Sequence, residues 1–376
     1  MPAEVPERPE RSFLLRSDGW PYLLVPFIPL AIVLDLAHAG AVLIFATSAL
    51  GVIPTAAMMG RATEELAARS GPGIGGLLNV TFGNAPELII ALFALNKGLQ
   101  EVVKASIVGS IIGNVLLVLG ASMFFGGLGR ERQRFNPTAA SAQSSMLLLA
   151  IAAVVMPAVF ELVDGKGLPA PSAEFVNYGT NVETLSLIAA GVLMGAYVGG
   201  LIFSLRTHRD LFNPQAEVEH EEEPWSVRRA VGALAIAGIA VAVMSEILVG
   251  SISETAEKAG LSEFFIGAIV VAIVGNAAEH WVAVLVARKD KMDLAVNISI
   301  GSSAQVALFV APVLVFASYV LGPGPMPLVF NGFEVAALIL AALIANQVTQ
   351  DGESTWFEGL QLLAVYTIIA VAFYFA

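Results

Sequence analysis

Two stretches of the sequence, GNAPELIIALFALNKG (residues 83–98) and GNAAEHWVAVLVARKD (residues 275–290), each place one glutamate inside a long apolar run. They align without a gap at an offset of 192 residues, so that Glu87 corresponds to Glu279. The match continues through the pairs Gly109/Gly301, Ser110/Ser302, Leu116/Leu308 and Val118/Val310. Helix packing in lipid favours small residues anyway, but Asn and Glu are costly there and are not readily preserved by chance. We interpret the two stretches as an internal repeat.

The composition is that of an integral membrane protein. Of the 376 residues, 57% are hydrophobic and 13% charged, with a mean hydropathy of +0.78. A soluble domain carries about 25% charged residues. The formal net charge of −12 therefore says little about soluble partners, and no nucleic acid is expected among them. The sequence holds no cysteine, which excludes disulfides, thiolate metal sites and cysteine nucleophiles.

Apolar windows of the length that spans a bilayer recur along the chain. They predict an all-α fold of about eleven transmembrane helices, at residues 20–38, 40–60, 71–96, 102–127, 140–160, 183–204, 228–250, 262–287, 293–321, 327–347 and 356–376. With a cytoplasmic N-terminus, the cytoplasmic loops would hold fifteen of the 19 basic residues and the outer loops only Lys97, Lys104, Lys166 and Lys258. This asymmetry predicts a cytoplasmic N-terminus and an external C-terminus.

The two quoted stretches lie five predicted spans apart, in the third and the eighth, so the copies should enter the membrane from opposite sides. This arrangement is an inverted-topology repeat, from which many secondary transporters are built. The predicted organisation is a cytoplasmic tail (1–19), an extra first helix (20–38), a first five-helix repeat (40–204), an acidic cytoplasmic linker (205–227) and a second five-helix repeat (228–376). The tail lacks the charged-then-apolar order of a cleavable signal. The GNAPE and GNAAE motifs are expected on broken helices.

Each repeated glutamate needs a neutralising partner, because a charge at mid-bilayer costs about 2.5–3.5 kcal/mol or more. No lysine or arginine is expected beside them within a span. The remaining candidates for neutralising the glutamates are protons or a cation from outside. If the repeats pack about a pseudo-two-fold axis, Glu87 and Glu279 meet near the midplane. The pair then has two neutral states, doubly protonated or doubly ionised around one divalent cation. A protein that changes its open side only when neutral would exchange a divalent ion for protons.

Calcium fits this hypothesis best, because it takes about six to eight oxygen ligands in a flexible shell. Two carboxylates supply at most four, and the remaining candidates are Asn84, Asn276, Ser110, Ser302 and Gln305. Backbone carbonyls at a helix break are another source. Pro86 lacks an N–H and should free the carbonyls of Phe82 and Gly83, whereas a break in GNAAE would depend on Gly275 alone. No imidazole or thiolate cluster indicates zinc or copper.

The residues 62–120, ATEELAARSGPGIGGLLNVTFGNAPELIIALFALNKGLQEVVKASIVGSIIGNVLLVLG, and 274–313, VGNAAEHWVAVLVARKDKMDLAVNISIGSSAQVALFVAPV, resemble the two repeats of the calcium (cation)/proton exchanger family, often called CAX. The late DGESTWFEG (351–359) resembles that family too. The resemblance implies eleven helices in two inverted halves, Glu87 and Glu279 as cation ligands and proton acceptors, and Asn276, Ser110, Ser302 and Gln305 as lining residues. It also implies that Glu64 and Glu246 lie near the ion pathway.

Several of these residues also have a purely structural interpretation. Glu87 and Glu279 could be structural buried carboxylates, although an acid inside a membrane is functional by default. His280 either orients Glu279 or is a packed polar residue. Glu64 and Glu65 lie beside Arg61, where a solvated face is an equal alternative, and Glu257 matches Glu65 at the repeat offset. The run from Glu217 to Glu223 is typical of a solvated linker, with a cation-attracting or calcium-sensing role as the alternative. Serines in small-residue patches also serve packing.

Three rival functions remain to be weighed against Ca²⁺/H⁺ exchange. A sodium/calcium exchanger of the same superfamily would carry hydroxyl-rich motifs, which GNAPE and GNAAE are not. A cation channel could share acidic pore residues but would not need an inverted pair of motifs. An intramembrane metalloprotease lacks its His-Glu-x-x-His motif here. The prediction is thus a transporter and not an enzyme, without cofactor, with Ca²⁺ and H⁺ as substrates.

The surroundings of the protein follow less directly from the sequence. Short tails and the absence of a targeting signal favour a prokaryotic cell membrane over a vacuolar one. The lipid bilayer is the expected environment, and association into a homo-oligomer stays open. Selectivity among divalent cations also stays open.

Overall fold

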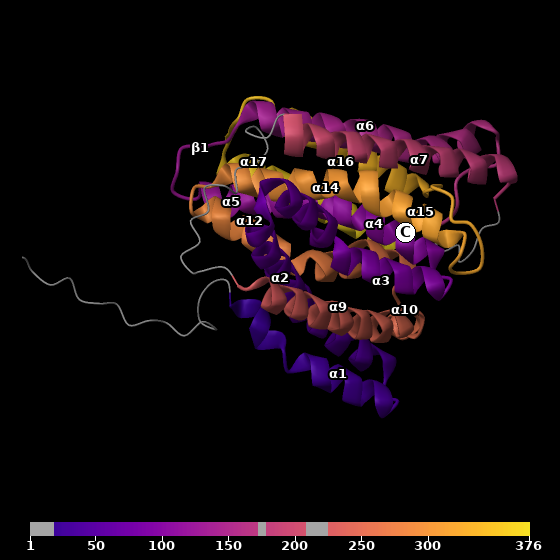
Figure 1. The fold of residues 1–376 in the computed structure, drawn as a ribbon. Helices are drawn as coiled ribbons and strands as arrows, with labels where there is room; N and C mark the ends of the chain where they lie inside the picture. The colour runs from indigo at the N-terminus through magenta and orange to yellow at the C-terminus, as the bar shows by residue number, and fades with distance from the viewer. Residues whose placement is uncertain (1–18, 172–177, 208–224) are drawn as a thin grey trace, which may run out of the picture.

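The computed structural model describes residues 19–171, 178–207 and 225–376, and it shows a bundle of long helices (Figure 1). The predicted N-terminal tail and most of the predicted acidic linker lie outside the described residues. The longer helices are α1 (Phe27–Leu36), α2 (Ala41–Gly83), α3 (Ala85–Asn96), α4 (Gln100–Ile112), α5 (Leu119–Gly127), α6 (Pro137–Val163), α7 (Thr180–Ile202), α9 (Val227–Gly250), α12 (Ala272–Arg288), α15 (Ala311–Ser318), α16 (Gly332–Val348) and α17 (Trp356–Phe375).

Short helices complete the bundle. They are α10 (Ile252–Ala259), α11 (Glu263–Phe265), α13 (Met292–Val296), α14 (Ser302–Gln305) and a 3₁₀ turn at Trp20–Leu24. Within the described ranges, eight helical spans are long and apolar enough to cross a membrane, and the bent pair Leu77–Gly83 with Ala85–Asn96 makes a ninth. Trp20–Leu36 and Gly332–Val348 are apolar but shorter. The membrane class is confirmed, and the count of eleven spans stays a prediction.

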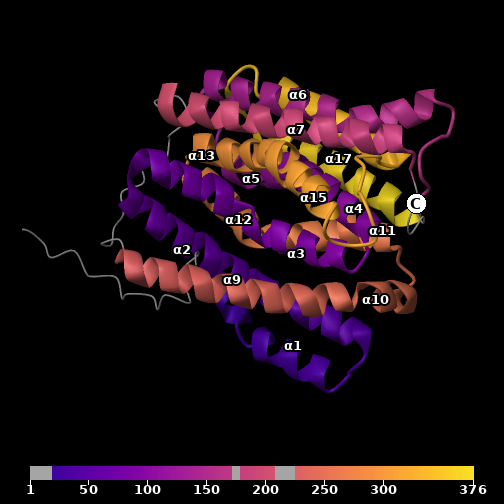
Figure 2. The same cartoon turned by 45° about the vertical axis from the view of Figure 1, so that its right-hand side comes forward.

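Helix α2 folds back on itself, as its two limbs in Figure 2 show. A methyl group at Gly75 would touch the backbone of Ala67. In a straight helix these residues would be about 12 Å apart along the axis. The chain therefore reverses between them, which explains why the sequence shows two apolar windows, 40–60 and 71–96, where helical backbone runs from Ala41 to Gly83.

Several helices contain wider π-helical turns. In the central helices these segments are Gly113–Val118, Ile266–Val271, Asn297–Gly301 and Val306–Val310, and another follows α7 at Phe203–Thr207. Of the four central segments, Gly113–Val118 and Val306–Val310 correspond closely at the repeat offset. Wider turns of this kind are frequent at functional sites. Apolar periodicity does not reveal them, so the sequence predicted plain spans at 102–127 and 293–321, and at 262–287 it predicted a break at GNAAE instead of a wider turn before it.

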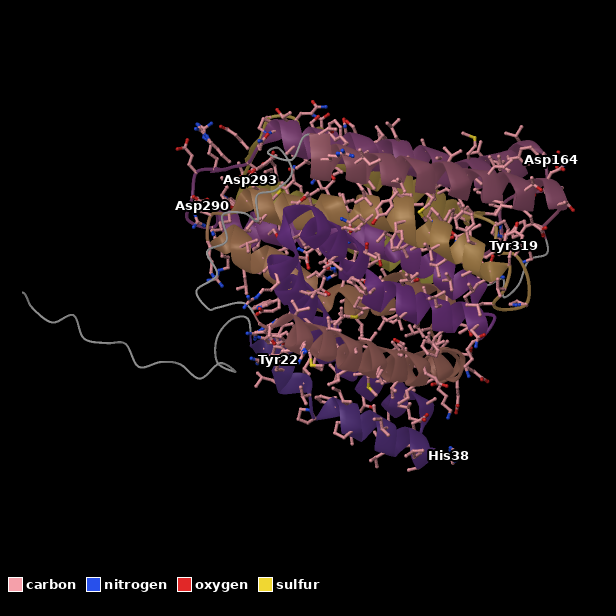
Figure 3. The ribbon with its side chains drawn as sticks, viewed as in Figure 1. Tyr22, His38, Asp164, Asp290, Asp293 and Tyr319 are labelled. Carbon is pink, nitrogen blue, oxygen red and sulfur yellow. The ribbon has the colours of Figure 1, made fainter. Side chains whose placement is uncertain are left out.

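The two motif helices run in opposite directions through the bundle. The chain after α3 reaches the end marked by Tyr319, since Gly98 lies against Pro323 and Gln100 donates to the carbonyl of Gly324 at 2.7 Å. Helix α12 leads instead to Asp290, at the opposite end of the molecule (Figure 3). Ser303 donates to the carbonyl of Ile111 at 3.3 Å. These two residues are equivalent at the repeat offset, so their contact lies close to the pseudo-two-fold axis.

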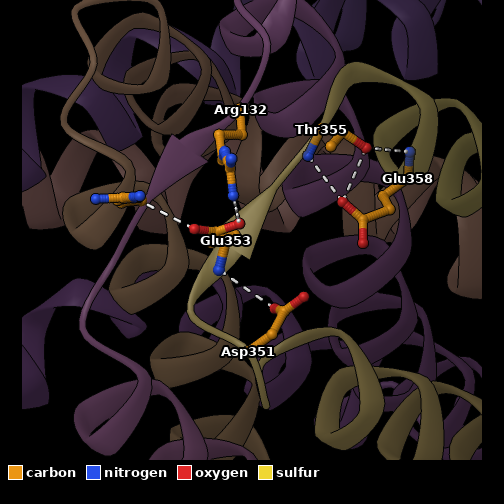
Figure 4. Close-up of polar contacts among 6 residues, drawn as sticks. Arg132, Asp351, Glu353, Thr355 and Glu358 are labelled. Atoms are coloured by element: carbon orange, nitrogen blue, oxygen red, sulfur yellow. Dashed lines mark hydrogen bonds and ion pairs between the residues drawn. The ribbon is translucent and has the colours of Figure 1, made fainter.

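A small antiparallel sheet departs from the predicted all-α fold. Strand β1 (Gln133–Arg134) pairs with β2 (Glu353–Ser354), which lies within the DGESTWFEG stretch. Arg132 and Arg134 both reach the Glu353 carboxylate, at 2.6 and 3.3 Å, and the hydrogen bond from Arg132 lowers the pKa of Glu353 (Figure 4). Because this pair is exposed, it adds little stability. Strand pairing between distant loops cannot be read from hydropathy.

The loop beside this sheet fixes the end of α12. The buried Gln133 amide donates to the Ala287 carbonyl and to Asp290 Oδ1, both at 2.8 Å. At the start of α17, Thr355 and Glu358 form a capping box (Figure 4). The helix that carries Glu279 is therefore held at its C-terminal end by side-chain contacts from the first half of the chain.

Close helix packing in the centre depends on Gly109. A methyl group there would overlap the Ala268 carbonyl oxygen. We expect Gly109→Ala to destabilise the protein by roughly 1–3 kcal/mol, because backbone rather than a flexible side chain would have to move. Thermal unfolding of the detergent-solubilised protein measures this, with Gly191→Ala as the control, since a methyl group at Gly191 meets nothing within 4 Å. Equal melting temperatures for the two variants would contradict the packing described.

Candidate cation-binding site

Glu87 and Glu279 pack against each other's motif. A methyl group at Gly275 would lie 3.4 Å from Glu87 Cγ, and one at Gly83 would lie 3.6 Å from Glu279 Oε1. Each glutamate thus packs against the glycine that begins the motif of the other repeat. A methyl group would fit at either glycine in van der Waals contact with the glutamate, but a larger side chain would take the space beside the carboxylate. The structure therefore brings together the two acids that the sequence singled out.

The local sequence explains how Glu87 is placed. The chain bends by 41° between Leu77–Gly83 and Ala85–Asn96, and α3 begins at this bend with Pro86 in its first turn. Glu87 lies in that first turn, where the partial positive charge of a helix N-terminus favours a carboxylate. The Phe82 carbonyl accepts the Asn84 N–H, which leaves it one lone pair. The predicted break in GNAPE is confirmed.

The predicted break in GNAAE is wrong. Helix α12 runs without interruption from Ala272 to Arg288 through Gly275. Without a proline, every residue keeps its backbone donor, and a single glycine is not enough to end a helix. Irregularity in this half lies one turn earlier, in the π-helical segment Ile266–Val271. Glu279 therefore does not lie at a helix N-terminus as Glu87 does. Instead, its Oε2 accepts a hydrogen bond from Ser302 at 3.3 Å.

The polar residues predicted to line the site are also gathered there. Asn84 Nδ2 donates to Gln305 Oε1 at 2.7 Å, and Asn276 Nδ2 donates to Ser110 Oγ at 3.2 Å. The pattern is not symmetric, since strict symmetry would pair Asn84 with Ser302. These contacts join the N-terminal half to the C-terminal half at the level of the two glutamates.

Three buried oxygens at this site have no hydrogen-bond donor among the described residues. They are Asn84 Oδ1, Asn276 Oδ1 and Glu87 Oε2. Each asparagine is only 1% exposed, so a missing partner is costly. Oxygen acceptors without donors suit a cation, and a hard one such as Ca²⁺ prefers carboxylate, amide and carbonyl oxygens. Within the described ranges, no three His, Cys, Asp or Glu side chains group as metal ligands, so the amides would have to complete the shell.

The residues predicted to lie around the site or along the ion pathway divide into those with buried or ordered contacts and those that are exposed. His280 Nε2 lies 3.1 Å from Oδ1 of the buried Asn114, a residue that the sequence analysis did not single out. A polar residue inside the apolar run 111–119 was the signal that could have found it. Glu65 accepts the backbone N–H of Trp225 at 2.8 Å, which ties α2 to the start of α9. Glu64, Glu246 and Glu257 are exposed, and no described contact joins Glu246 or Glu257 to the pair.

One basic residue was placed wrongly from the sequence. Lys104, expected in an outer loop, lies on α4 and is 1% exposed. Its ammonium group donates to the Val329 carbonyl at 2.7 Å and pairs with Glu101 at 2.7 Å. It is thus engaged near the Tyr319 end of the bundle.

Antiparallel motif helices with paired acids at their crossing define a secondary transporter built from inverted repeats. The chain belongs to the sodium/calcium exchanger protein family, whose model matches residues 40–206 and 229–375. The match leaves out the first apolar helix and most of the predicted acidic linker.

Relatives of this chain are found in bacteria and in fungi. It is 46% identical to the Ca(2+)/H(+) antiporter ChaA of Bacillus subtilis, with 94% of this chain and 97% of that protein covered. It is 43% identical to a Ca(2+)/H(+) antiporter of Synechocystis, covering 94% and 96%. A vacuolar calcium ion transporter of Schizosaccharomyces pombe is 37% identical, covering 94% and 84%.

Solved structures agree with this assignment. The structure of native YfkE is similar with a TM-score of 0.80 at 42% identity, covering 95% of this chain and 100% of that one. The H+/Ca2+ exchanger CAX gives a TM-score of 0.68 at 17% identity, covering 96% and 93%, a likeness that concerns the fold alone.

Proposed function

We propose that this protein is an antiporter that exchanges Ca²⁺ for H⁺ across a membrane, by alternating access to one central site. The observation that supports it most directly is the reciprocal packing of Glu87 and Glu279 on Gly275 and Gly83, next to amide oxygens that have no donor. The relatives at 43% and 46% identity are named Ca²⁺/H⁺ antiporters, which supports the same substrates.

The mechanism follows from charge balance at the two carboxylates. With both protonated, the site is neutral, and with both ionised it is neutral only around one divalent cation. The empty, doubly negative site is disfavoured because like charges at close range in a low-dielectric interior repel strongly. If the helices rearrange only around a neutral site, each Ca²⁺ that leaves is replaced by two protons before the site returns. Ser302, Asn84, Asn276 and Gln305 would hold the carboxylates and complete the calcium shell.

Sodium coupling is the alternative, since the family model is described by sodium/calcium exchange. The motif cores GNAPE and GNAAE place Ala or Pro rather than Ser or Thr before each glutamate, which leaves few hydroxyl oxygens for sodium sites. Calcium uptake into proteoliposomes decides between the two. We expect uptake driven by an imposed pH gradient without sodium. Uptake driven by a sodium gradient at equal pH, and not by a pH gradient, would refute proton coupling.

Calcium affinity should depend on pH, because protons and Ca²⁺ compete for the same oxygens. While both carboxyl groups are protonated, the half-saturating Ca²⁺ concentration should fall by up to roughly 100-fold per pH unit, since two protons leave for each ion bound. The dependence should vanish at a pH where both are ionised. Calcium binding measured by isothermal titration across pH 5–9 gives the slope. A flat affinity over this whole range would place the protons elsewhere.

The sidedness of the protein is part of the proposal. The excess of basic residues in one set of predicted loops supports a cytoplasmic N-terminus and an external C-terminus. The similarity to bacterial antiporters supports a prokaryotic cell membrane as its location.

A further inference from the structure

Two amide side chains outside the site described above contact each other within the membrane span. Gln143 on α6 donates from Nε2 to Asn297 Oδ1 at 2.5 Å. Asn297 begins the π-helical segment that ends at Gly301. A methyl group at Gly301 would lie 3.4 Å from Asn297 Oδ1 and 3.8 Å from Gln143 Nε2. The next residue, Ser302, donates to Glu279. The amide pair is therefore adjacent to the site along the chain.

The depth of the amide pair can be estimated from the helix starts. At about 1.5 Å per residue, Asn297 lies about 8 Å from the start of α13 at Met292, and Ser302 lies about 15 Å from the same start. Gln143 lies about 9 Å beyond the start of α6 at Pro137. The two helices begin together, since the Asn136 N–H donates to Asp293 Oδ1 at 2.6 Å. The pair thus lies between the glutamates and the end marked by Asp290 and Asp293 in Figure 3.

Both amide side chains are half-buried within apolar spans, so the protein leaves part of each side chain uncovered. Facing hydrocarbon would leave polar atoms unsatisfied at a cost of several kcal/mol each. Polar side chains at this depth are tolerated where they line a water-filled cavity or the interior of a bundle. The open side of Gln143 and Asn297 is therefore best satisfied by water.

The other half of the repeat has no such pair. At the repeat offset, Asn297 corresponds to the fully buried Ala105, and Gln143 to Val335. Gly301 corresponds to Gly109, which is closed against the Ala268 carbonyl. The two equivalent positions on the opposite side of the glutamates are thus apolar, although the buried charged residues Lys104 and Glu334 are their neighbours in the chain. The amide pair therefore lies on one side of the site only.

We propose that Gln143 and Asn297 line the hydrated route between Glu279 and the Asp290 end of the bundle, the end predicted to be cytoplasmic. Their carbonyl oxygens replace water molecules that Ca²⁺ loses as it approaches the glutamates, since calcium accepts amide oxygens in a flexible shell. The proposal rests on the proposed function for the identity of the ion, but the water route itself does not depend on it.

The absence of cysteine from the sequence allows a direct test. Gln143→Cys and Asn297→Cys would each be treated with a membrane-impermeant, positively charged methanethiosulfonate, added to either side of oriented vesicles. We expect both thiols to react only from the Asp290 end, at least tenfold slower when Ca²⁺ is present. Ser299→Cys is the matched control, because Ser299 lies in the same segment, is fully buried and should not react.

Three results would overturn the proposal. They are no reaction of either thiol, reaction from the opposite side at an equal rate, and reaction of Ser299→Cys as fast as Asn297→Cys. Thermal unfolding of each variant shows that the protein is folded when labelled. Failure of labelling while wild-type exchange is normal refutes the route alone. One-sided labelling in a protein that lacks proton-driven exchange refutes the proposed function alone.

Transport itself gives a second readout. We expect Gln143→Leu to raise the half-saturating Ca²⁺ concentration about tenfold when Ca²⁺ is supplied at the Asp290 end, because one oxygen ligand and its water are lost. The value measured from the opposite side should stay within about twofold, since the route there does not pass the amide pair. Equal increases on both sides would assign Gln143 to the central site instead.

Discussion

Glu279→Gln is expected to abolish proton-driven calcium transport, and Glu87→Gln is expected to do the same. Glutamine keeps the shape of the side chain but can neither release a proton nor neutralise half of a divalent charge. Removing one partner of a buried ion pair, here one carboxylate that faces Ca²⁺, costs about 3–5 kcal/mol, which corresponds to a loss of roughly 100-fold to 4,000-fold in calcium affinity. Uptake of radioactive Ca²⁺ into proteoliposomes under a pH gradient measures the effect.

The matched control for both variants is Glu254→Gln. Glu254 is an exposed glutamate of α10 that pairs with Lys258, and no described contact joins its side chain to α3 or α12. Its replacement should leave transport at the wild-type rate. All three proteins should also unfold at similar temperatures, which separates loss of function from loss of the fold. Wild-type transport by either Glu87→Gln or Glu279→Gln would disprove the role given to the pair.

Gly275→Val is expected to reduce calcium transport by roughly 100-fold, because the side chain would extend into the space beside Glu87 that the cation needs. A single methyl group already reaches 3.4 Å from Glu87 Cγ, so Gly275→Ala should be tolerated better than valine. Gly83→Val should act in the same way on Glu279, whose Oε1 would lie 3.6 Å from the first added carbon. Rates from the same proteoliposome assay give the order of the variants.

Gly195→Val provides the control for added bulk within a membrane helix. Gly195 is exposed on α7, and a methyl group there meets nothing within 4 Å. The variant should transport at the wild-type rate. If Gly83→Val and Gly275→Val also transported normally, the two glycines would not border the cation, and the central position of the carboxylates would be wrong.

The sequence predicted the membrane class, the positions of the apolar helices and the repeated acid, because each depends on a local property. Hydropathy is summed over a window of neighbouring residues. A proline breaks its own helix wherever the helix lies, which is why the bend at GNAPE was correctly predicted. GNAAE has no proline, and the break predicted there is absent. The repeat appeared because Asn and Glu are rare and costly in apolar runs.

Only the tertiary structure decided which side chains meet. The contacts of Asn84 with Gln305, Asn114 with His280 and Gln143 with Asn297 each join segments far apart in the chain. The burial of Lys104 and the pairing of β1 with β2 do the same. Two glycines that match in the repeat are also packed differently, since Gly109 is closed against Ala268 while Gly301 lies against a polar pair. Such differences arise from long-range packing of whole helices, which the order of residues within one helix does not encode.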